Sequence, residues 1–182
     1  MIHFYHPNKA VKGSAASFWY SQSNNSVFAQ IMKQSCWDTA ADNGVFKDNS
    51  PAMKVTIKLS QTEVAAILDC VERNRPFTTH HDFGDNPKNI SFVPTYDKTD
   101  TTKQIGYDFS FLVMDKTDST KKESFFIRFK LAEARLIREL LIHFLHKQFD
   151  SVNKFTENRS NSEPQEVPAA EETTGSDPLT GL

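Results

Sequence analysis

The chain has little cysteine and glycine and no long apolar run. Its only cysteines are Cys36 and Cys70, and it has no Cys-x-x-Cys pair, which excludes a disulfide framework. Cys70 falls beside the apolar stripe of a predicted helix, so we expect it to be a buried thiol. No segment approaches the roughly 20 apolar residues of a membrane span. The first residues, MIHFYHP, lack a basic region followed by an apolar run, so we expect no secretory signal and a cytoplasmic location.

The sequence also lacks the motifs of common catalytic sites. It has no glycine-rich phosphate loop, no Gly-x-Ser-x-Gly and no His-Glu-x-x-His. Its carboxylates are scattered, and Glu63 is explained by a helix cap. We therefore predict no catalytic residues and a protein that is not an enzyme.

Histidine gives no convincing metal site. His80, His81 and Asp82 are adjacent, and neighbouring side chains of an extended segment point to opposite faces. The pair His143 and His146 supplies two ligands, fewer than the three or four that zinc needs. We predict no metal site and no cofactor, and we expect His81 and Asp82 to organise the segment after the first helix.

The chain contains one sequence pattern, a strand followed directly by a helix, at two places. Residues 54–71 read KVTIKLSQTEVAAILDCV, and residues 125–145 read FFIRFKLAEARLIRELLIHFL. In the first, apolar residues alternate with Lys54 and Lys58, which is the period of a half-buried strand. Ser60 and Glu63 then form a capping box that starts a helix. The apolar stripe of that helix has the i, i+3, i+4, i+7 spacing and consists of Val64, Ile67, Leu68 and Val71.

The second copy follows at a constant spacing. Adding 72 places Val55 on Ile127, and adding 73 places Val64 on Ile137. The sequence therefore predicts an α+β domain over residues 1–150 with two repeats, 1–76 and 77–150, each an antiparallel four-stranded sheet followed by a helix that covers it. We expect a long surface loop over residues 38–52, and an edge strand over Ile90–Tyr96 because Pro94 interrupts it.

Charge separates this body from a tail. Residues 1–150 hold 19 Lys+Arg and 17 Asp+Glu, a net charge of 19 − 17 = +2, whereas residues 151–182 hold 2 and 6, a net charge of 2 − 6 = −4. The second segment is poor in aromatics and rich in Ser, Glu, Pro and Thr, a composition that predicts disorder. We therefore predict a disordered acidic tail over residues 151–182.

Cations and rings recur on the strand faces that point away from the predicted helices. The outward positions before the first helix include Lys54 and Lys58, and those before the second include Phe126, Arg128 and Lys130. Single-stranded nucleic acid is bound by cations along its phosphates and by flat rings under its bases. Trp19 and Tyr20 point to opposite faces, so only one can stack on a strand lying across the sheet. Solvated lysines and rings packed in the core remain the alternative at any single position.

Three stretches resemble the Whirly family of single-stranded-DNA-binding proteins. Lys12-Gly13-Ser14-Ala15-Ala16 is similar to that family's Lys-Gly-Lys-Ala-Ala signature, and Phe77–Phe83 is similar to its aromatic and His-Asp segment. The segment from Ser124 to Leu145 resembles its final strand and helix. The resemblance spans about residues 2–150 and implies a homotetramer, or another homo-oligomer, that binds single strands across its sheets. The residues we predict to contact nucleic acid are Lys12, Phe18, Trp19, Tyr20, Phe28, Lys54, Lys58, Tyr96, Tyr107, Phe126, Arg128 and Lys130.

The chain departs from that family in two ways. Ser14 stands where the signature has its second lysine, and the tail and missing transit peptide do not resemble a plant organellar member. The acidic tail and the missing transit peptide fit a bacterial or phage relative better, in a bacterial cell or a virus-infected host. The tail resembles the acidic tails of bacterial and phage single-strand-binding proteins. Such a tail competes with DNA and docks replication or repair proteins, here through Asp177, Leu179 and Leu182. A tail that serves only solubility is the alternative.

The function expected from the sequence is therefore binding without catalysis. We expect a protein that coats and protects single-stranded DNA in replication, recombination or repair, with little sequence preference. One alternative is a protein that binds or anneals single-stranded RNA on the same fold. The other is a protein-interaction scaffold whose aromatic faces bury one another in an oligomer.

Overall fold

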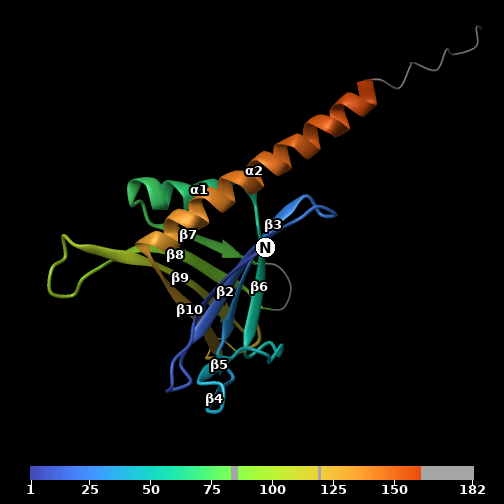
Figure 1. The fold of residues 1–182 in the computed structure, drawn as a ribbon. Helices are drawn as coiled ribbons and strands as arrows, with labels where there is room; N and C mark the ends of the chain where they lie inside the picture. Colours follow the sequence, from blue (N-terminus) through green and yellow to red (C-terminus); the bar gives the residue numbers. More distant parts are fainter. Residues whose placement is uncertain (83–85, 119, 161–182) are drawn as a thin grey trace, which may run out of the picture.

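A computed structural model describes residues 1–82, 86–118 and 120–160. It holds two sheets beneath two helices, with a small hairpin at the far end of the first sheet (Figure 1). The elements of the first repeat are β1 (Ile2–His6), β2 (Ser14–Ser21), β3 (Ser26–Lys33), β4 (Cys36–Asp38), β5 (Asn43–Val45), β6 (Lys54–Leu59) and α1 (Gln61–Arg73). Those of the second are β7 (Phe77–His81), β8 (Lys88–Tyr96), β9 (Gln104–Met114), β10 (Lys122–Lys130) and α2 (Leu131–Ser160).

The topology confirms the predicted fold class. The first sheet has the order β1-β2-β3-β6 and the second the order β10-β9-β8-β7, with every pair antiparallel. Each sheet is followed by a helix, and the last strands β6 and β10 are the segments that the 72-residue spacing relates. Helix α1 begins at the predicted capping box, in which the Glu63 N–H donates to the Ser60 hydroxyl and the Glu63 carboxylate accepts from the Ser60 N–H.

One core joins the two repeats, because the inner faces of both sheets meet in a cluster of phenylalanines. The Phe18 ring lies 5.6 Å from that of Phe109 and 6.1 Å from that of Phe129, and the Phe4 ring lies 5.1 Å from Phe129. All four of these side chains are buried. Because the cluster takes rings from both sheets, neither sheet has a core of its own.

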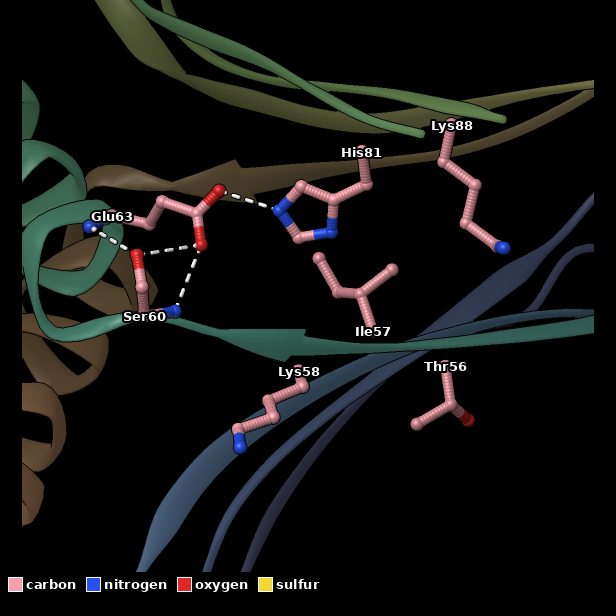
Figure 2. A pocket seen from close by; sticks show the side chains of 7 residues that line it. All are labelled: Thr56, Ile57, Lys58, Ser60, Glu63, His81 and Lys88. Carbon is pink, nitrogen blue, oxygen red and sulfur yellow. Dashed lines mark hydrogen bonds and ion pairs between the residues drawn. The ribbon is translucent and has the colours of Figure 1, made fainter. Parts of the chain in front are cut away.

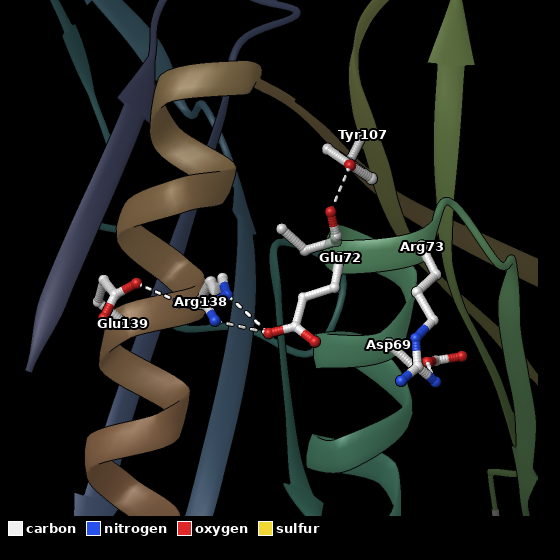
Figure 3. Close-up of polar contacts among 7 residues, drawn as sticks. Asp69, Glu72, Arg73, Tyr107, Arg138 and Glu139 are labelled. Atoms are coloured by element: carbon white, nitrogen blue, oxygen red, sulfur yellow. Dashed lines mark hydrogen bonds and ion pairs between the residues drawn. The ribbon is translucent and has the colours of Figure 1, made fainter.

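The first helix does not cover the sheet that precedes it, contrary to prediction. Helix α1 packs on β7 and β8 of the second sheet and on α2. The thiol of Cys70 is buried, as predicted, and donates to the carbonyl of Phe92 on β8 at 3.3 Å. Burial raises the pKa of this thiol to about 11. Between the helices, the Arg138 guanidinium contacts the Glu72 carboxylate at 2.7 Å (Figure 3).

Helix α2 extends past the predicted start of the tail. Helix α2 spans Leu131–Ser160, so residues 151–160 of the predicted tail are helical. The first repeat contacts this part of α2. The Tyr20 hydroxyl lies 3.2 Å from the Ser151 hydroxyl, and the Gln148 amide donates to the Asn25 carbonyl at 3.0 Å. The predicted tail contacts Asp177, Leu179 and Leu182 lie outside the described residues.

A short hairpin occupies the first part of the predicted loop over residues 38–52, and residues 46–52 form no helix or strand. Strand β4 pairs with β5, and the Ser35 N–H and hydroxyl both donate to the Val45 carbonyl at 2.9 Å. The buried Gln34 amide holds the hairpin against the β1–β2 loop, since it donates to the carbonyls of Asn8 and Cys36 and accepts from the Asn8 N–H. These bonds span distant parts of the sequence, which is why composition alone predicts a loop here.

The predicted edge strand at Pro94 is an interior strand. β8 lies between β9 and β7, but β7 begins at Phe77, which pairs with Phe92. Pro94 therefore lies beyond the part of β8 that β7 covers, and its missing N–H costs no bond to that strand.

Two loops of the second sheet share nearly one sequence and one geometry. Residues 97–103 read DKTDTTK and residues 115–121 read DKTDSTK. In each, the first aspartate, Asp97 or Asp115, accepts from the N–H and the hydroxyl of the threonine two residues later. These bonds hold the pKa of both aspartates below their usual range. Loops built this way fix the register of the strands on either side.

Among the described residues, neither helix is long and apolar enough to cross a membrane.

The phenylalanine cluster can be tested with neighbouring positions of β10. Phe129→Ala removes a fully buried ring, and we expect the free energy of unfolding to fall by about 3–5 kcal/mol because a cavity remains. Phe126→Ala removes a ring of the opposite face that is 45% exposed, and we expect a change of only about 0.5 kcal/mol. Urea unfolding of both variants measures the difference, and equal losses would contradict the assigned faces.

Candidate nucleic-acid interface

The outer face of the first sheet gathers rings, amides and lysines. Because side chains alternate along a strand, residues one position away from the buried ones point outward. We call this surface the first-sheet face. It consists of His3, Tyr5, Ala15, Ser17, Trp19, Phe28, Gln30, Met32, Lys54, Thr56 and Lys58.

Strand pairing sorts these residues into three rows across the sheet. In the first row Trp19 is opposite Phe28, and Phe28 is opposite Lys58. The two rings stack, with centroids 5.4 Å apart and planes at 13°. We call this stacked pair, which ends at a lysine, the aromatic platform.

The second row is polar and its members bond to one another. The His3 ring nitrogen Nδ1 lies 2.7 Å from the Ser17 hydroxyl, and the Gln30 amide donates to the Thr56 hydroxyl at 2.8 Å. The third row runs from a ring to a lysine, and comprises Tyr5, Ala15, Met32 and Lys54. Lysines thus end the first and third rows, with polar groups between them.

The electrostatics of this face are one-sided. Strands β1, β2, β3 and β6 contain no aspartate or glutamate. Lys54 donates to the neutral side-chain oxygen of Asn49 at 2.7 Å, and Lys58 forms no ion pair within the described residues. The positive charge of both lysines is therefore left for a ligand.

The outer face of the second sheet is different, although the sequence predicts equivalent cations there. Phe126, Arg128 and Lys130 do point outward, and all three are exposed. The Arg128 guanidinium, however, forms two bonds to the Asp108 carboxylate, at 2.6 and 3.0 Å, and these bonds raise its pKa. Its charge is compensated by a neighbouring strand, so this face attracts phosphate less.

Three residues predicted to contact nucleic acid face inward instead. Phe18 is fully buried in the phenylalanine cluster. Tyr107 is buried, and its hydroxyl donates to the Val71 carbonyl at 3.0 Å at the end of α1 (Figure 3). Tyr20 packs on Phe144 of α2, with ring centroids 6.2 Å apart. The strand register thus turns all three away from the outer faces of the sheets and leaves Trp19 as the outward member of its pair.

Two further predicted residues lie away from the first-sheet face. Tyr96 is 39% exposed at the end of β8. Lys12 is exposed in the β1–β2 loop and lines a shallow pocket with Phe126 of the second sheet. Its neighbour Gly13 is required there, because a Cβ atom would lie 2.2 Å from the Gln34 side-chain oxygen and 2.6 Å from the His6 carbonyl oxygen.

A pocket of about 520 Å³ opens beside the edge of the first-sheet face. It is lined by Thr56, Ile57, Lys58, Ser60, Glu63, His81 and Lys88 (Figure 2). Lys58 and Thr56 lie on one side of β6, whereas Ile57, His81 and Lys88 lie on the other. The pocket therefore extends from Lys58, on the first-sheet face, around the edge of β6 to a second lysine, Lys88.

His81 and Glu63 organise the wall of this pocket. The His81 Nε2 atom lies 2.6 Å from the Glu63 carboxylate, which ties β7 to the first turn of α1. Burial acts to raise the pKa of Glu63, but the bonds from Ser60 and His81 outweigh it, so the pKa lies below its usual range. Asp82 pairs with Lys116 at 3.2 Å, so the segment after the first helix is organised by both residues, as predicted.

The lowered pKa gives a testable pH dependence. A carboxylate whose folded pKa is depressed stabilises the fold above its unfolded pKa, about 4.3 for glutamate, and loses that contribution as the pH falls through the folded value. We expect Glu63→Gln to lower the free energy of unfolding at pH 7 by about 0.5–2 kcal/mol. The deficit should shrink below about pH 4.

Denaturant unfolding at pH 7 and pH 3 measures this difference. Glu72→Gln is the matched control, since it removes the exposed partner of Arg138 on the same helix and such pairs contribute at most about 1 kcal/mol. A Glu63→Gln deficit that is the same at both pH values would show that the carboxylate has no special role.

Comparison with known proteins bears on the fold. No family model and no curated protein matches the sequence. Among solved structures, the plant transcriptional regulator PBF-2 superimposes with a TM-score of 0.58 at 15% identity, over 89% of this chain and 88% of that one. WHY3 from Arabidopsis thaliana gives 0.57 at 15% identity, over 88% and 95%, and MRP1/MRP2 from Trypanosoma brucei gives 0.56 at 16% identity, over 80% and 83%. PBF-2 and WHY3 are Whirly proteins, so the chain has a Whirly-like fold.

Proposed function

We propose that the chain is a non-enzymatic single-stranded-DNA-binding protein, and that the first-sheet face is its contact surface. One observation carries this proposal: the stacked Trp19–Phe28 platform lies beside the uncompensated lysines of β6, on strands that contain no acidic residue. Lys54 and Lys58 serve the phosphates, and the rings serve the bases. The Whirly-like fold and the motif resemblance support the same function.

The chemistry of the three rows favours an unpaired strand over a duplex. Each base stacked on an aromatic ring contributes about 1–3 kcal/mol, and stacking requires a base that is free of its neighbours. In a duplex the base faces are occupied, so Trp19 and Tyr5 would meet only the backbone. The polar row formed by Ser17, Gln30 and Thr56 offers hydrogen bonds to base edges, which any of the four bases can use.

The wider role is part of the proposal. A protein of this kind coats and protects DNA in replication, recombination or repair, acts as a homo-oligomer, and recruits partners through residues 151–182. The basic pocket at Lys58 and Lys88 gives the strand a path from the first-sheet face over the edge of β6. An RNA strand satisfies the same stacking and phosphate contacts, so competition between matched DNA and RNA oligomers decides between them.

The aromatic platform provides the first test. Trp19→Ala should weaken binding to oligo-dT by about 5–150-fold, which corresponds to the loss of one base stack. Phe126→Ala, an exposed ring of the second sheet, should leave the affinity within about twofold. Fluorescence anisotropy with single-stranded and duplex DNA measures both. Equal affinity of the unaltered protein for the two DNA forms would overturn the proposal.

The lysines provide the second test. Each phosphate contact contributes about −0.7 to the slope of log K against log salt for a single strand. We expect Lys54→Ala and Lys58→Ala each to reduce the magnitude of that slope by about this amount. Lys98→Ala and Lys103→Ala are the controls, since both residues are exposed in the β8–β9 loop, which projects away from the first sheet (Figure 1). A slope that changes equally for both pairs would place the contact elsewhere.

A further inference from the structure

The β4–β5 hairpin distinguishes the two repeats. In the first repeat, the connection from β3 to β6 spans residues 34–53 and carries the rings of Trp37 and Phe46. In the second, the equivalent connection from β9 to β10 spans residues 115–121 and has no aromatic residue. The hairpin is therefore an addition to the shared plan, placed at the end of the sheet that carries the candidate interface.

The hairpin encloses a pocket of about 460 Å³ against the first-sheet face. Its lining combines two rings, two polar side chains and a lysine, and comprises Tyr5, Asp38, Ala41, Asn43, Gly44, Val45, Phe46 and Lys47. The Tyr5 and Phe46 rings lie 5.6 Å apart at 58°. Tyr5 is 57% exposed and also begins the third row of the first-sheet face. A strand lying on that face therefore leads into the pocket.

Hydrogen bonds hold the polar side chains of the pocket in place, and each side chain retains atoms that can bond to a ligand. Asp38 Oδ1 accepts from the N–H groups of Ala40 and Ala41 at 2.9 and 3.0 Å, which leaves its Oδ2 atom without a bond among the described residues. Asn43 Oδ1 accepts from the Gly44 N–H at 2.8 Å, which leaves the amide N–H groups as donors. The site thus offers a fixed acceptor and a fixed donor beside two rings.

Resting on the proposed function, we propose that this pocket takes one base of the bound strand and selects bases with an exocyclic amino group. Cytosine, adenine and guanine each present an N–H₂ donor that the Asp38 carboxylate can accept, and a ring acceptor or carbonyl for the Asn43 amide. Thymine has no amino group. It presents carbonyl oxygens on both sides of its N–H, and these oxygens repel the Asp38 carboxylate. Lys47 is exposed at the pocket and neutralises the adjoining phosphate.

The packing of the hairpin keeps the pocket preformed. A Cβ atom on Gly44 would lie 2.5 Å from Pro7 Cβ and 3.0 Å from Gln34 Cδ, so the hairpin and the β1–β2 loop are in close contact. Lys9 adds an ion pair with Asp42 at 3.0 Å and lies 5.7 Å from the centroid of the Trp37 ring. A pocket held by a rigid wall selects a base without the cost of ordering the loop on binding.

The test uses oligo-dT strands in which one position at a time is replaced by dC, dA or dG. We expect at least one position at which the replacement tightens binding roughly fivefold or more, the lower end of discrimination by specific base contacts. Asp38→Asn keeps an oxygen for Ala40 and Ala41 but removes the charge. It should abolish this preference, and it should tighten oligo-dT binding rather than weaken it, because the repulsion between the carboxylate and the thymine carbonyl oxygens is removed.

Asp48→Asn is the matched control, because Asp48 belongs to the same connection between β3 and β6 but does not line the pocket. It should retain the preference. As a second measurement, 5-iodo-dC at the preferred position should photo-crosslink to Tyr5 or Phe46. Binding of every oligomer with equal affinity, or a crosslink confined to other residues, would overturn the pocket and leave the proposed function standing. Failure to bind any single strand at low salt would overturn the proposed function itself.

Discussion

The meeting of two sheets through one phenylalanine cluster is the constraint on which the rest of the structure depends. Phe18 of β2 and Phe129 of β10 must both point inward to fill the space between the sheets. Since side chains alternate along a strand, this requirement also fixes what points outward. The Trp19–Phe28 platform and the lysines of β6 lie on the surface because their neighbours are needed in the core. The ligand-facing chemistry is thus set by packing on the opposite side of the same strands.

Charge then makes the two repeats unequal. Both repeats place a basic residue on the strand before their helix, but Arg128 has Asp108 opposite it on β9, whereas Lys58 has Phe28 opposite it on β3. A bidentate pair between an arginine and a carboxylate satisfies both groups. A lysine beside a ring keeps its charge available for another partner. The carboxylate of Asp108 therefore compensates the charge of Arg128 on the second sheet, whereas the charge of Lys58 on the first sheet stays available, although the backbone plan is the same.

The sequence predicts the parts of this structure that depend on local periodicity. The strand and helix of Lys54–Arg73, their copy 72 residues later, and the capping box at Ser60 all follow from spacing. The outward orientation of Trp19 follows only when the strand pairing is known, because Phe28 and Lys58 then share its register. The strand pairing itself is a long-range property, and without it Phe18, Tyr20 and Tyr107 read as candidates equal to Trp19.

The features that were missed depend on contacts between distant segments. The β4–β5 hairpin has strands of three residues each, too short for a periodic signal, and is held by the buried amide of Gln34. The place of Pro94 in an interior strand depends on where β7 begins. Tyr20 and Asn25 of the first repeat contact α2 at Ser151 and Gln148. In each case a partner remote in sequence overrides the local composition.

The placement of α1 over β7 and β8 binds the two halves of the chain into one folding unit. A polypeptide carrying residues 1–76 alone would have a helix with no sheet beneath it and a sheet without the rings of β9 and β10. Such a fragment would have to exchange its helix with another copy to become stable, as domain-swapped dimers do. Joining two such copies in one chain removes the dependence of that exchange on concentration, and it allows the second sheet to diverge while the first keeps its receptive surface.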